Sequence, residues 1–226
     1  MRYGKGAVPL RQLKERRLAR LRGLYAIVDG SAARPPLELV QAFLRGGAGV
    51  VQLRLKTLPA RDLLEVAREA SAVCRQRGAL LLVNDRPDVA RAAGADGAHL
   101  GQDDLPPEAA REVLGEDALI GVSTHSDAEI DKALASGADY LGFGPVFETR
   151  SKPGAPLPPP QGLSGLERAV RRAAPTPVVA IGGLTAGSAA AVARAGAACA
   201  AAIGELCQAA DPESAARALA EAFARG

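Results

Sequence analysis

Three polar side chains alternate with leucines in a short segment near residue 50 of this 226-residue chain. The segment reads Gln52-Leu53-Arg54-Leu55-Lys56. An extended strand points alternate residues to opposite faces, which puts the amide and the two cations on one face and the leucines on the other. An amphipathic strand would show this polar face to water, whereas a parallel barrel strand is covered on both sides. Inside such a barrel the amide and the cations would point together toward a bound anion.

Two aspartates, Asp85 and Asp104, follow two consecutive predicted strands. Mg²⁺ is commonly held by one or two carboxylates together with waters and phosphate oxygens, so the pair could bind this ion and offset the charge of a diphosphate. Alternatively, each aspartate caps the next helix, because Arg86-Pro87 and Leu105-Pro106 are typical of helix starts. The spacing leaves magnesium binding and helix capping equally open.

Later strand ends carry residues that suit phosphate oxygens. The segment Thr149-Arg150-Ser151-Lys152 brings two hydroxyls and a lysine close together, which favours short charge-assisted hydrogen bonds to an anion. A solvated polar turn would have the same composition. Gly183 and Gly204 end the last two predicted strands, where backbone N–H groups often approach a phosphate, although a tight turn would also use glycine.

The chain has two histidines, His99 and His125. His125 follows a predicted strand and could be a general base, a structural donor or a partner of the next helix. His99 lies inside an apolar segment, so we expect it to make a hydrogen bond within the core.

The elements that must position these residues are short apolar runs rich in Val, Ile and Leu, separated by segments of helical period such as 59–77 and 127–136. This alternation predicts an α/β fold, a single parallel (β/α)₈ TIM barrel, in which the carboxyl ends of the strands meet at one face. The eight predicted strands are Leu24–Asp29, Val50–Lys56, Leu80–Asp85, Gly97–Gln102, Leu119–His125, Tyr140–Phe147, Val178–Leu184 and Cys199–Leu206.

A weak internal repeat supports the barrel, since Gly-Ala precedes a predicted strand at residues 47, 94, 137 and 196, where glycine suits a left-handed helix cap. Residues 23–226 form the predicted barrel domain. Residues 1–22, rich in Arg and Lys, form an N-terminal extension, either an extra helix or a mobile arm. The proline-rich stretch 153–160 is expected to be a surface loop near the active face, where its stiffness could help a lid.

Composition excludes several classes of function. The 28 basic and 25 acidic residues are interspersed, which argues against a nucleic-acid partner and favours phosphorylated small molecules. Three cysteines without a CxxC pair indicate neither a disulfide framework nor a zinc site. No apolar run of about 18 residues and no signal peptide occur. We therefore expect a soluble cytoplasmic protein without a membrane partner, and a homo-oligomer is possible.

Taken in order, these motifs resemble the thiamine phosphate synthase and thiazole tautomerase family over about residues 23–222. The matching motifs are Gln-x-Arg-x-Lys, Asn-Asp, His-x-Gly-Gln-x-Asp, Gly-x-Ser, Thr-x-Ser-Lys and Ile-Gly-Gly. The resemblance implies a transferase that couples an aminopyrimidine diphosphate to a thiazole phosphate, carboxylated or not. Pyrophosphate would leave to give a pyrimidine cation, and Mg²⁺ would be the cofactor.

The resemblance also implies roles for single residues. Asp85 and Asp104 would bind Mg²⁺. The pyrimidine diphosphate would be held by Gln52, Arg54, Lys56, Asn84, Ser123 and Lys152, of which Arg54, Lys56, Ser123 and Lys152 are the predicted catalytic groups. The thiazole phosphate would be held by Thr149, Ser151, Gly183, Ile203 and Gly204. Leu53, Leu55 and Arg150 lie within these motifs and are counted among the substrate-binding residues.

Four positions depart from the family pattern: Leu55, Glu148, Ser151 and Gly204 stand where Glu, Pro, Thr and Ser are usual. Only Gly204 removes a side-chain donor, so we expect weaker thiazole-phosphate binding. Two rival functions remain. One is a thiazole tautomerase of the same family, in which His125 would transfer the proton. The other is a barrel that binds a phosphorylated metabolite without turning it over.

Overall fold

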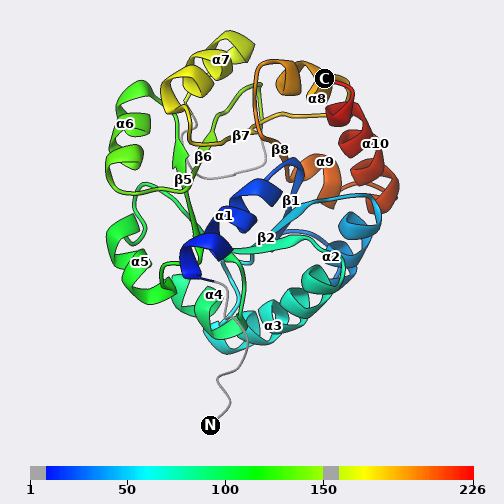
Figure 1. The fold of residues 1–226 in the computed structure, drawn as a ribbon. Coiled ribbons are helices and arrows are strands. Elements are labelled where there is room, and N and C mark those ends of the chain that lie inside the picture. Colours follow the sequence, from blue (N-terminus) through cyan, green and yellow to red (C-terminus); the bar gives the residue numbers. More distant parts are fainter. Residues whose placement is uncertain (1–8, 150–157) are drawn as a thin grey trace.

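Eight parallel strands close into a barrel in the order β1 to β8, and helices surround it (Figure 1). The structure, a computed structural model, describes residues 9–149 and 158–226. The predicted TIM barrel is confirmed. The strands are β1 Gly23–Asp29, β2 Val50–Arg54, β3 Leu80–Asn84, β4 Gly97–Leu100, β5 Leu119–Thr124, β6 Tyr140–Phe143, β7 Val178–Ile181 and β8 Cys199–Ala202.

The helices begin and end close to the segments of helical period. For example, α3 and α6 lie within one residue of the predicted segments 59–77 and 127–136. In the described residues they are α1 Leu10–Arg20, α2 Pro36–Arg45, α3 Ala60–Gln76, α4 Pro87–Ala93, α5 Pro107–Leu114, α6 Asp127–Ala135, α7 Gly162–Ala173, α8 Ala186–Arg194, α9 Gly204–Cys207 and α10 Pro212–Ala224. None of these helices has the length and apolar character needed to cross a lipid bilayer.

Two apolar layers explain why the strands are hydrophobic almost throughout. Along β1, Tyr25 and Ile27 point into the barrel, whereas Leu24, Ala26 and Val28 pack outward against the helices. Both faces of each strand are therefore buried, as expected for a parallel sheet covered by helices. Parallel pairing of β1 with β8 closes the ring.

Seven of the eight predicted strands end too late, and the excess is largest at β6, which ends at Phe143 instead of Phe147, and at β8, which ends at Ala202 instead of Leu206. Val146 and Leu206, which follow these strands, are fully buried although neither belongs to a strand. Buried apolar residues that follow a strand therefore look like strand residues in the sequence, and they made the predicted strands too long. The four Gly-Ala predictions are confirmed, with φ of 94°, 66°, 80° and 90° at Gly47, Gly94, Gly137 and Gly196.

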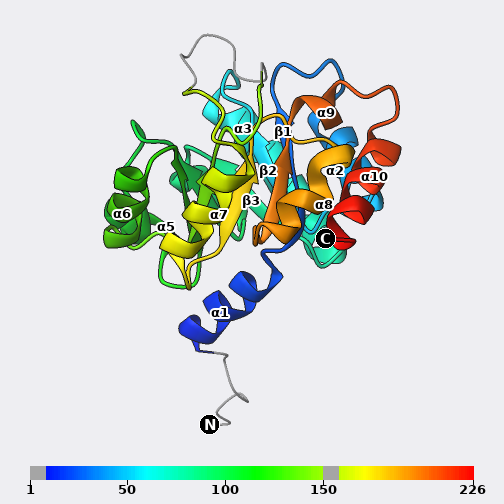
Figure 2. The same ribbon diagram turned by 90° about the horizontal axis from the view of Figure 1, so that it is seen from above.

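Helix α1 lies across the amino-terminal end of the barrel, beyond the strands in Figure 2. Arg17 bonds to Asp96 (3.0 Å) and Asp117 (2.7 Å), and Lys14 lies 2.9 Å from Asp139. Leu21, just after the helix, is 2% exposed and packs in the interior layer. The sequence allowed either an extra helix or a mobile arm here. In the described part of the extension, the extra helix is confirmed.

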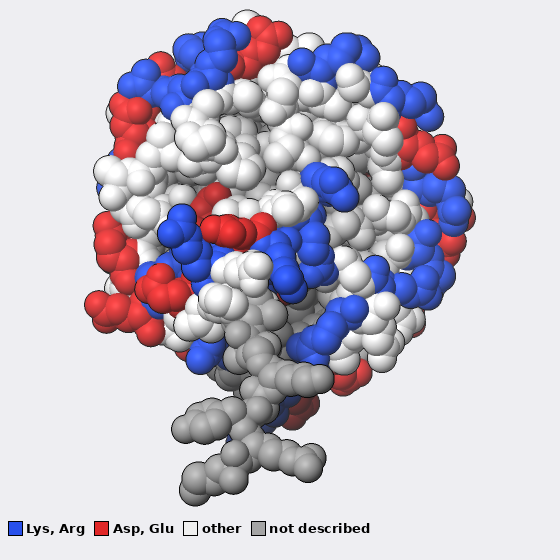
Figure 3. All heavy atoms as spheres, viewed as in Figure 1, with Lys and Arg blue, Asp and Glu red and all other residues white. Residues whose placement is uncertain are grey.

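On the face seen in Figure 3, side chains of both signs are intermixed around the rim and on α1. This distribution agrees with the interspersed charges of the sequence.

Candidate active site

The carboxyl ends of the strands surround two adjoining cavities. A small one of about 30 Å³ lies inside the barrel and is lined by residues of β1 to β8, among them Gln52, Arg54, Asn84 and Ser123. A larger one of about 320 Å³ lies over the ends of β5 to β8. Ser123 lines both, so the two cavities form one continuous site.

The polar face of β2 points into this site. Gln52 is 3% exposed and donates to the Tyr25 hydroxyl (2.7 Å), and Arg54 pairs with Asp29. Leu53 and Leu55 are buried in the outer layer against the helices, so only their backbone could face a substrate. The predicted alternation is confirmed from Gln52 to Leu55, whereas Lys56 lies beyond the strand, and a solvent-facing amphipathic strand is excluded.

Charge pairing holds Arg54 at the end of β2 and Lys56 just after it. Burial by itself would raise the pKa of Asp29, but hydrogen bonds from Ser31 and Arg54 and the charge of Arg54 lower it. Asp29 therefore stays ionised and holds the Arg54 guanidinium. Lys56 Nζ lies 2.7 Å from Asp85 Oδ2.

Asn84 reaches the small cavity with a donor that lacks a partner. Its Nδ2 is buried, and it is the only such side-chain atom without a hydrogen bond in the described residues. An unpaired buried donor costs free energy. The site is thus prepared for an acceptor that a ligand would bring.

Asp85 and Asp104 hydrogen-bond to each other across the ends of β3 and β4. Burial and then the bond with Asp85 raise the pKa of Asp104. Burial would also raise the pKa of Asp85, but its bonds with Asp104 and Lys56 and the charge of Lys56 lower it. Asp104 is therefore the more readily protonated member of the pair, and Asp85 the more acidic one.

Neither aspartate occupies a helix-capping position. The N-cap of α4 is Arg86 and that of α5 is Pro106. Asp104 instead accepts from the Gly101 backbone N–H (2.6 Å). Capping, one of the two predictions for this pair, is wrong. No cluster of three or more His, Cys, Asp or Glu that could hold a metal is found in residues 9–149 and 158–226, so any ion here would also need ligands from substrate or water.

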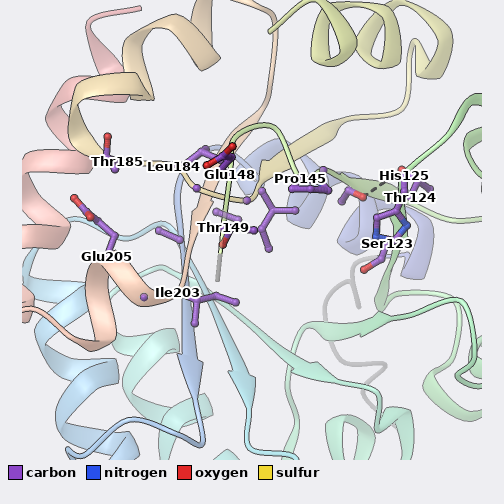
Figure 4. Close-up of a pocket in the computed structure, with 18 of the residues that line it drawn as sticks. Ser123, Thr124, His125, Pro145, Glu148, Thr149, Leu184, Thr185, Ile203 and Glu205 are labelled. Atoms are coloured by element: carbon purple, nitrogen blue, oxygen red, sulfur yellow. Dashed lines mark hydrogen bonds between the residues drawn. The ribbon is translucent and has the colours of Figure 1, made fainter. Parts of the chain in front are cut away.

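Two glycines line the larger cavity at positions where no other residue would fit. Gly182 and Gly183 have φ of 99° and 65°, and a Cβ on Gly183 would lie 2.3 Å from the Glu148 carbonyl oxygen. Thr149, Ile203 and Gly204 line the same cavity, with Glu148 and Glu205 beside them (Figure 4). The predicted residues Arg150, Ser151 and Lys152, and most of the stretch 153–160, lie outside the described residues.

His125 also lines the larger cavity, and its ring is oriented by Glu129. Nδ1 lies 2.9 Å from Glu129 Oε2, and the His125 backbone N–H donates to the same oxygen (2.7 Å). The sequence interpretation missed Glu129. Ser126 caps α6 by accepting from the Glu129 backbone N–H, and the Ser126-x-x-Glu129 spacing, typical of a helix start, was the available signal.

The predicted core hydrogen bond of His99 is confirmed, since its ring nitrogens lie 2.9 Å from the Tyr140 and Ser123 hydroxyls. The sequence interpretation gave no role to Tyr140 or Tyr25. Both tyrosines lie within predicted strands, and nothing in the local pattern marks a buried hydroxyl.

Comparisons with known proteins agree on one family. A family model described as thiamine monophosphate synthase matches residues 24–206. A thiamine-phosphate synthase of Anaeromyxobacter dehalogenans is 52% identical over 211 residues, covering 93% of this chain and 91% of that protein. One from Moorella thermoacetica is 46% identical over 206 residues, covering 89% and 96%.

Among solved structures, the thiamine phosphate pyrophosphorylase from Pyrococcus furiosus superposes with a TM-score of 0.83 at 36% identity, covering 92% of this chain and 98% of that one. A 3-hexulose-6-phosphate synthase superposes with a TM-score of 0.68 at 23% identity, covering 88% and 99%. The second similarity concerns the fold alone.

Proposed function

Because this chain belongs to the thiamine monophosphate synthase family, we propose that it is a transferase that couples 4-amino-2-methyl-5-hydroxymethylpyrimidine diphosphate to a thiazole phosphate. The products are thiamine phosphate and pyrophosphate. One observation carries the proposal: Arg54 and the unpaired Asn84 donor line one cavity at the strand ends, and the Lys56–Asp85 pair and Asp104 lie next to Asn84 along the strand ends. This set suits a small ring that carries a diphosphate.

In the proposed reaction, the bond between the pyrimidine methylene carbon and the diphosphate oxygen breaks, and its electron pair leaves with pyrophosphate. The thiazole nitrogen then forms the new bond with its own lone pair. That nitrogen has no proton to lose, so the step needs charge neutralisation and positioning more than a base. Arg54 and Lys56 supply positive charge near the leaving group, while Gln52, Asn84 and Ser123 hold the pyrimidine.

The carboxylate pair fits Mg²⁺. Two half-buried carboxylates that hydrogen-bond to each other are a site where a divalent cation can bind in place of a proton. When bound there by Asp85 and Asp104, Mg²⁺ neutralises part of the diphosphate charge. Lys56, already paired with Asp85, lies where it adds to this neutralisation.

The thiazole phosphate is placed in the larger cavity, at Thr149, Gly183, Ile203 and Gly204. From the family resemblance, Ser151 is also assigned to the thiazole phosphate and Lys152 to the diphosphate. The cavity volume of about 320 Å³ suits a small ligand. Glu148 and Glu205 bring negative charge to its lining, and Gly204 offers no side-chain hydroxyl, so the thiazole phosphate is bound weakly. A cytoplasmic location agrees with the three buried free cysteines.

The orientation of His125 by Glu129 in the same cavity supports a second candidate, thiazole isomerisation by proton transfer. Changing His125 to Ala separates the two. Loss of isomerisation with coupling preserved would establish a second activity, and loss of both would place His125 in the coupling reaction.

The first test is pyrophosphate release by the purified protein, given both substrates, with and without Mg²⁺. We expect release only when both substrates and the metal are present. No pyrophosphate release under any of these conditions would overturn the proposal and favour the tautomerase or a barrel that only binds its ligand.

A variant pair tests the metal residues. Asp104→Asn should lower Mg²⁺-dependent activity about 10- to 100-fold. The matched control is Asp62→Asn, an exposed carboxylate on α3, which should retain full activity. Equal activity of the two variants would exclude Asp104 from the metal site.

A further inference from the structure

A chain of four hydrogen bonds crosses the inside of the barrel and ends at Ser123. Gln52 Nε2 donates to the Tyr25 hydroxyl (2.7 Å), which lies 3.0 Å from the Tyr140 hydroxyl. Tyr140 lies 2.9 Å from His99 Nδ1, and His99 Nε2 lies 2.9 Å from Ser123 Oγ. The five residues come from β1, β2, β4, β5 and β6.

Both tyrosines keep their hydroxyl hydrogens. They are 1% and 0% exposed, and burial raises the pKa of each well above its usual value. Each hydroxyl therefore has one hydrogen to donate and can accept another.

One direction of the chain gives the buried hydroxyl hydrogen of Tyr25 an acceptor within it. The Tyr25 oxygen accepts from Gln52, so its own hydrogen goes to Tyr140. The hydrogen of Tyr140 then goes to His99 Nδ1, which leaves the ring proton on Nε2. Nε2 donates to Ser123 Oγ, and the Ser123 hydrogen remains for a ligand.

We propose that Tyr140 is a positioning residue that acts through His99 and makes Ser123 a hydrogen-bond donor to the pyrimidine diphosphate. The inference rests on the proposed function for the identity of that substrate. Ser123 and the unpaired Asn84 Nδ2 line the same small cavity. The cavity then presents two donors, which select a ligand with acceptor atoms at that place and disfavour one that presents N–H groups.

The direction of the chain is tested on the wild-type protein without any substrate. Labelling the histidines with ¹⁵N yields signals from two residues only, because the chain contains His99 and His125 alone, and His125→Asn assigns them. We expect His99 to carry its proton on Nε2. A proton on Nδ1 would reverse the chain and overturn the proposal. This measurement stands even if the protein catalyses no coupling, so it separates the inference from the proposed function.

The positioning role is tested by kinetics. Tyr140→Phe should raise the KM for the pyrimidine diphosphate about tenfold, as expected for one lost hydrogen bond, and leave the KM for the thiazole phosphate unchanged. In a Ser123→Ala background the same change should have no further effect, because Tyr140 acts through Ser123.

Equal effects of Tyr140→Phe in both backgrounds would show a structural role only and would contradict the proposal. Ser71→Ala is the matched control, since it removes a buried hydroxyl that bonds to the Gly94 carbonyl, far along the chain from the site. It should leave both KM values unchanged.

Discussion

Asn84 is proposed to bind the pyrimidine, and its unpaired buried donor lowers the stability of the free protein. Its buried Nδ2 has no partner among the described residues, so removing this donor breaks no hydrogen bond that they make. We predict that Asn84→Ala raises the KM for the pyrimidine diphosphate about tenfold while lowering the free energy of unfolding by less than about 1 kcal/mol. Steady-state kinetics and urea unfolding measure the two quantities.

The opposite pattern is expected of Ser71→Ala, which loses a hydrogen bond to the Gly94 carbonyl and should be destabilised by about 1 kcal/mol with normal kinetics. If Asn84→Ala instead destabilised the protein strongly and left KM unchanged, Asn84 would have a structural role.

Helix α1 is held mainly by charge. Asp96, Asp117 and Asp139 lie at the amino ends of β4, β5 and β6, and α1 supplies Arg17 and Lys14 to them. Since TIM-barrel sites lie at the opposite end, this contact serves stability. We predict that Arg17→Met lowers the free energy of unfolding by about 1 kcal/mol at pH 7, or Tm by about 2–4 °C, without changing activity.

This loss should depend on pH. Burial would raise the pKa of Asp117, but its hydrogen bond with Arg17 and the charge of Arg17 lower it in the folded protein. The stabilisation is therefore complete above the unfolded value of about 3.9 and disappears as the pH falls through the lower folded value. Calorimetry should show the wild type and Arg17→Met converging below about pH 4. Arg11→Met, whose side chain is 90% exposed, should match the wild type at every pH.

At the scale of the whole molecule, helix α10 packs against both the first and the last elements of the barrel. Helix α10 packs against α8, α2 and β1, and its Leu219 is fully buried. We predict that Leu219→Ala lowers the free energy of unfolding by about 2–5 kcal/mol. Circular dichroism follows the helices, and tyrosine fluorescence follows the barrel interior through Tyr25 and Tyr140, since the chain has no tryptophan.

Both signals should shift together, because closure of the ring makes unfolding a single transition. Glu221→Ala, an exposed position on the same helix, should change stability by no more than about 0.5 kcal/mol. Separate transitions for the two signals would show that α10 unfolds independently of the barrel.

The sequence was sufficient to predict the barrel, the number of strands and the glycine caps. These features follow from local rules, since a strand covered on both sides must be apolar and a left-handed cap favours glycine. Strand ends were predicted less well. Val146 and Leu206 are as buried as strand residues although the chain has already left the sheet.

At the site, alternation alone was enough to place Gln52, Arg54 and Lys56 on one face. It could not decide between capping and metal binding for Asp85 and Asp104, because both uses favour an aspartate between a strand and a helix. Capping was excluded only by the N-caps that the structure shows, Arg86 for α4 and Pro106 for α5, and metal binding stays a proposal.

The sequence by itself thus determined the fold, the family resemblance and some residues that line the cavities, such as Gln52, Arg54 and Asn84, all of which depend on residue type and short spacing. Only the tertiary structure decided how these residues are connected. Tyr25 and Tyr140 are 115 positions apart, and their hydroxyls meet because strands on different sides of a closed barrel share one interior. Pairing across that interior depends on barrel closure, which no local pattern encodes.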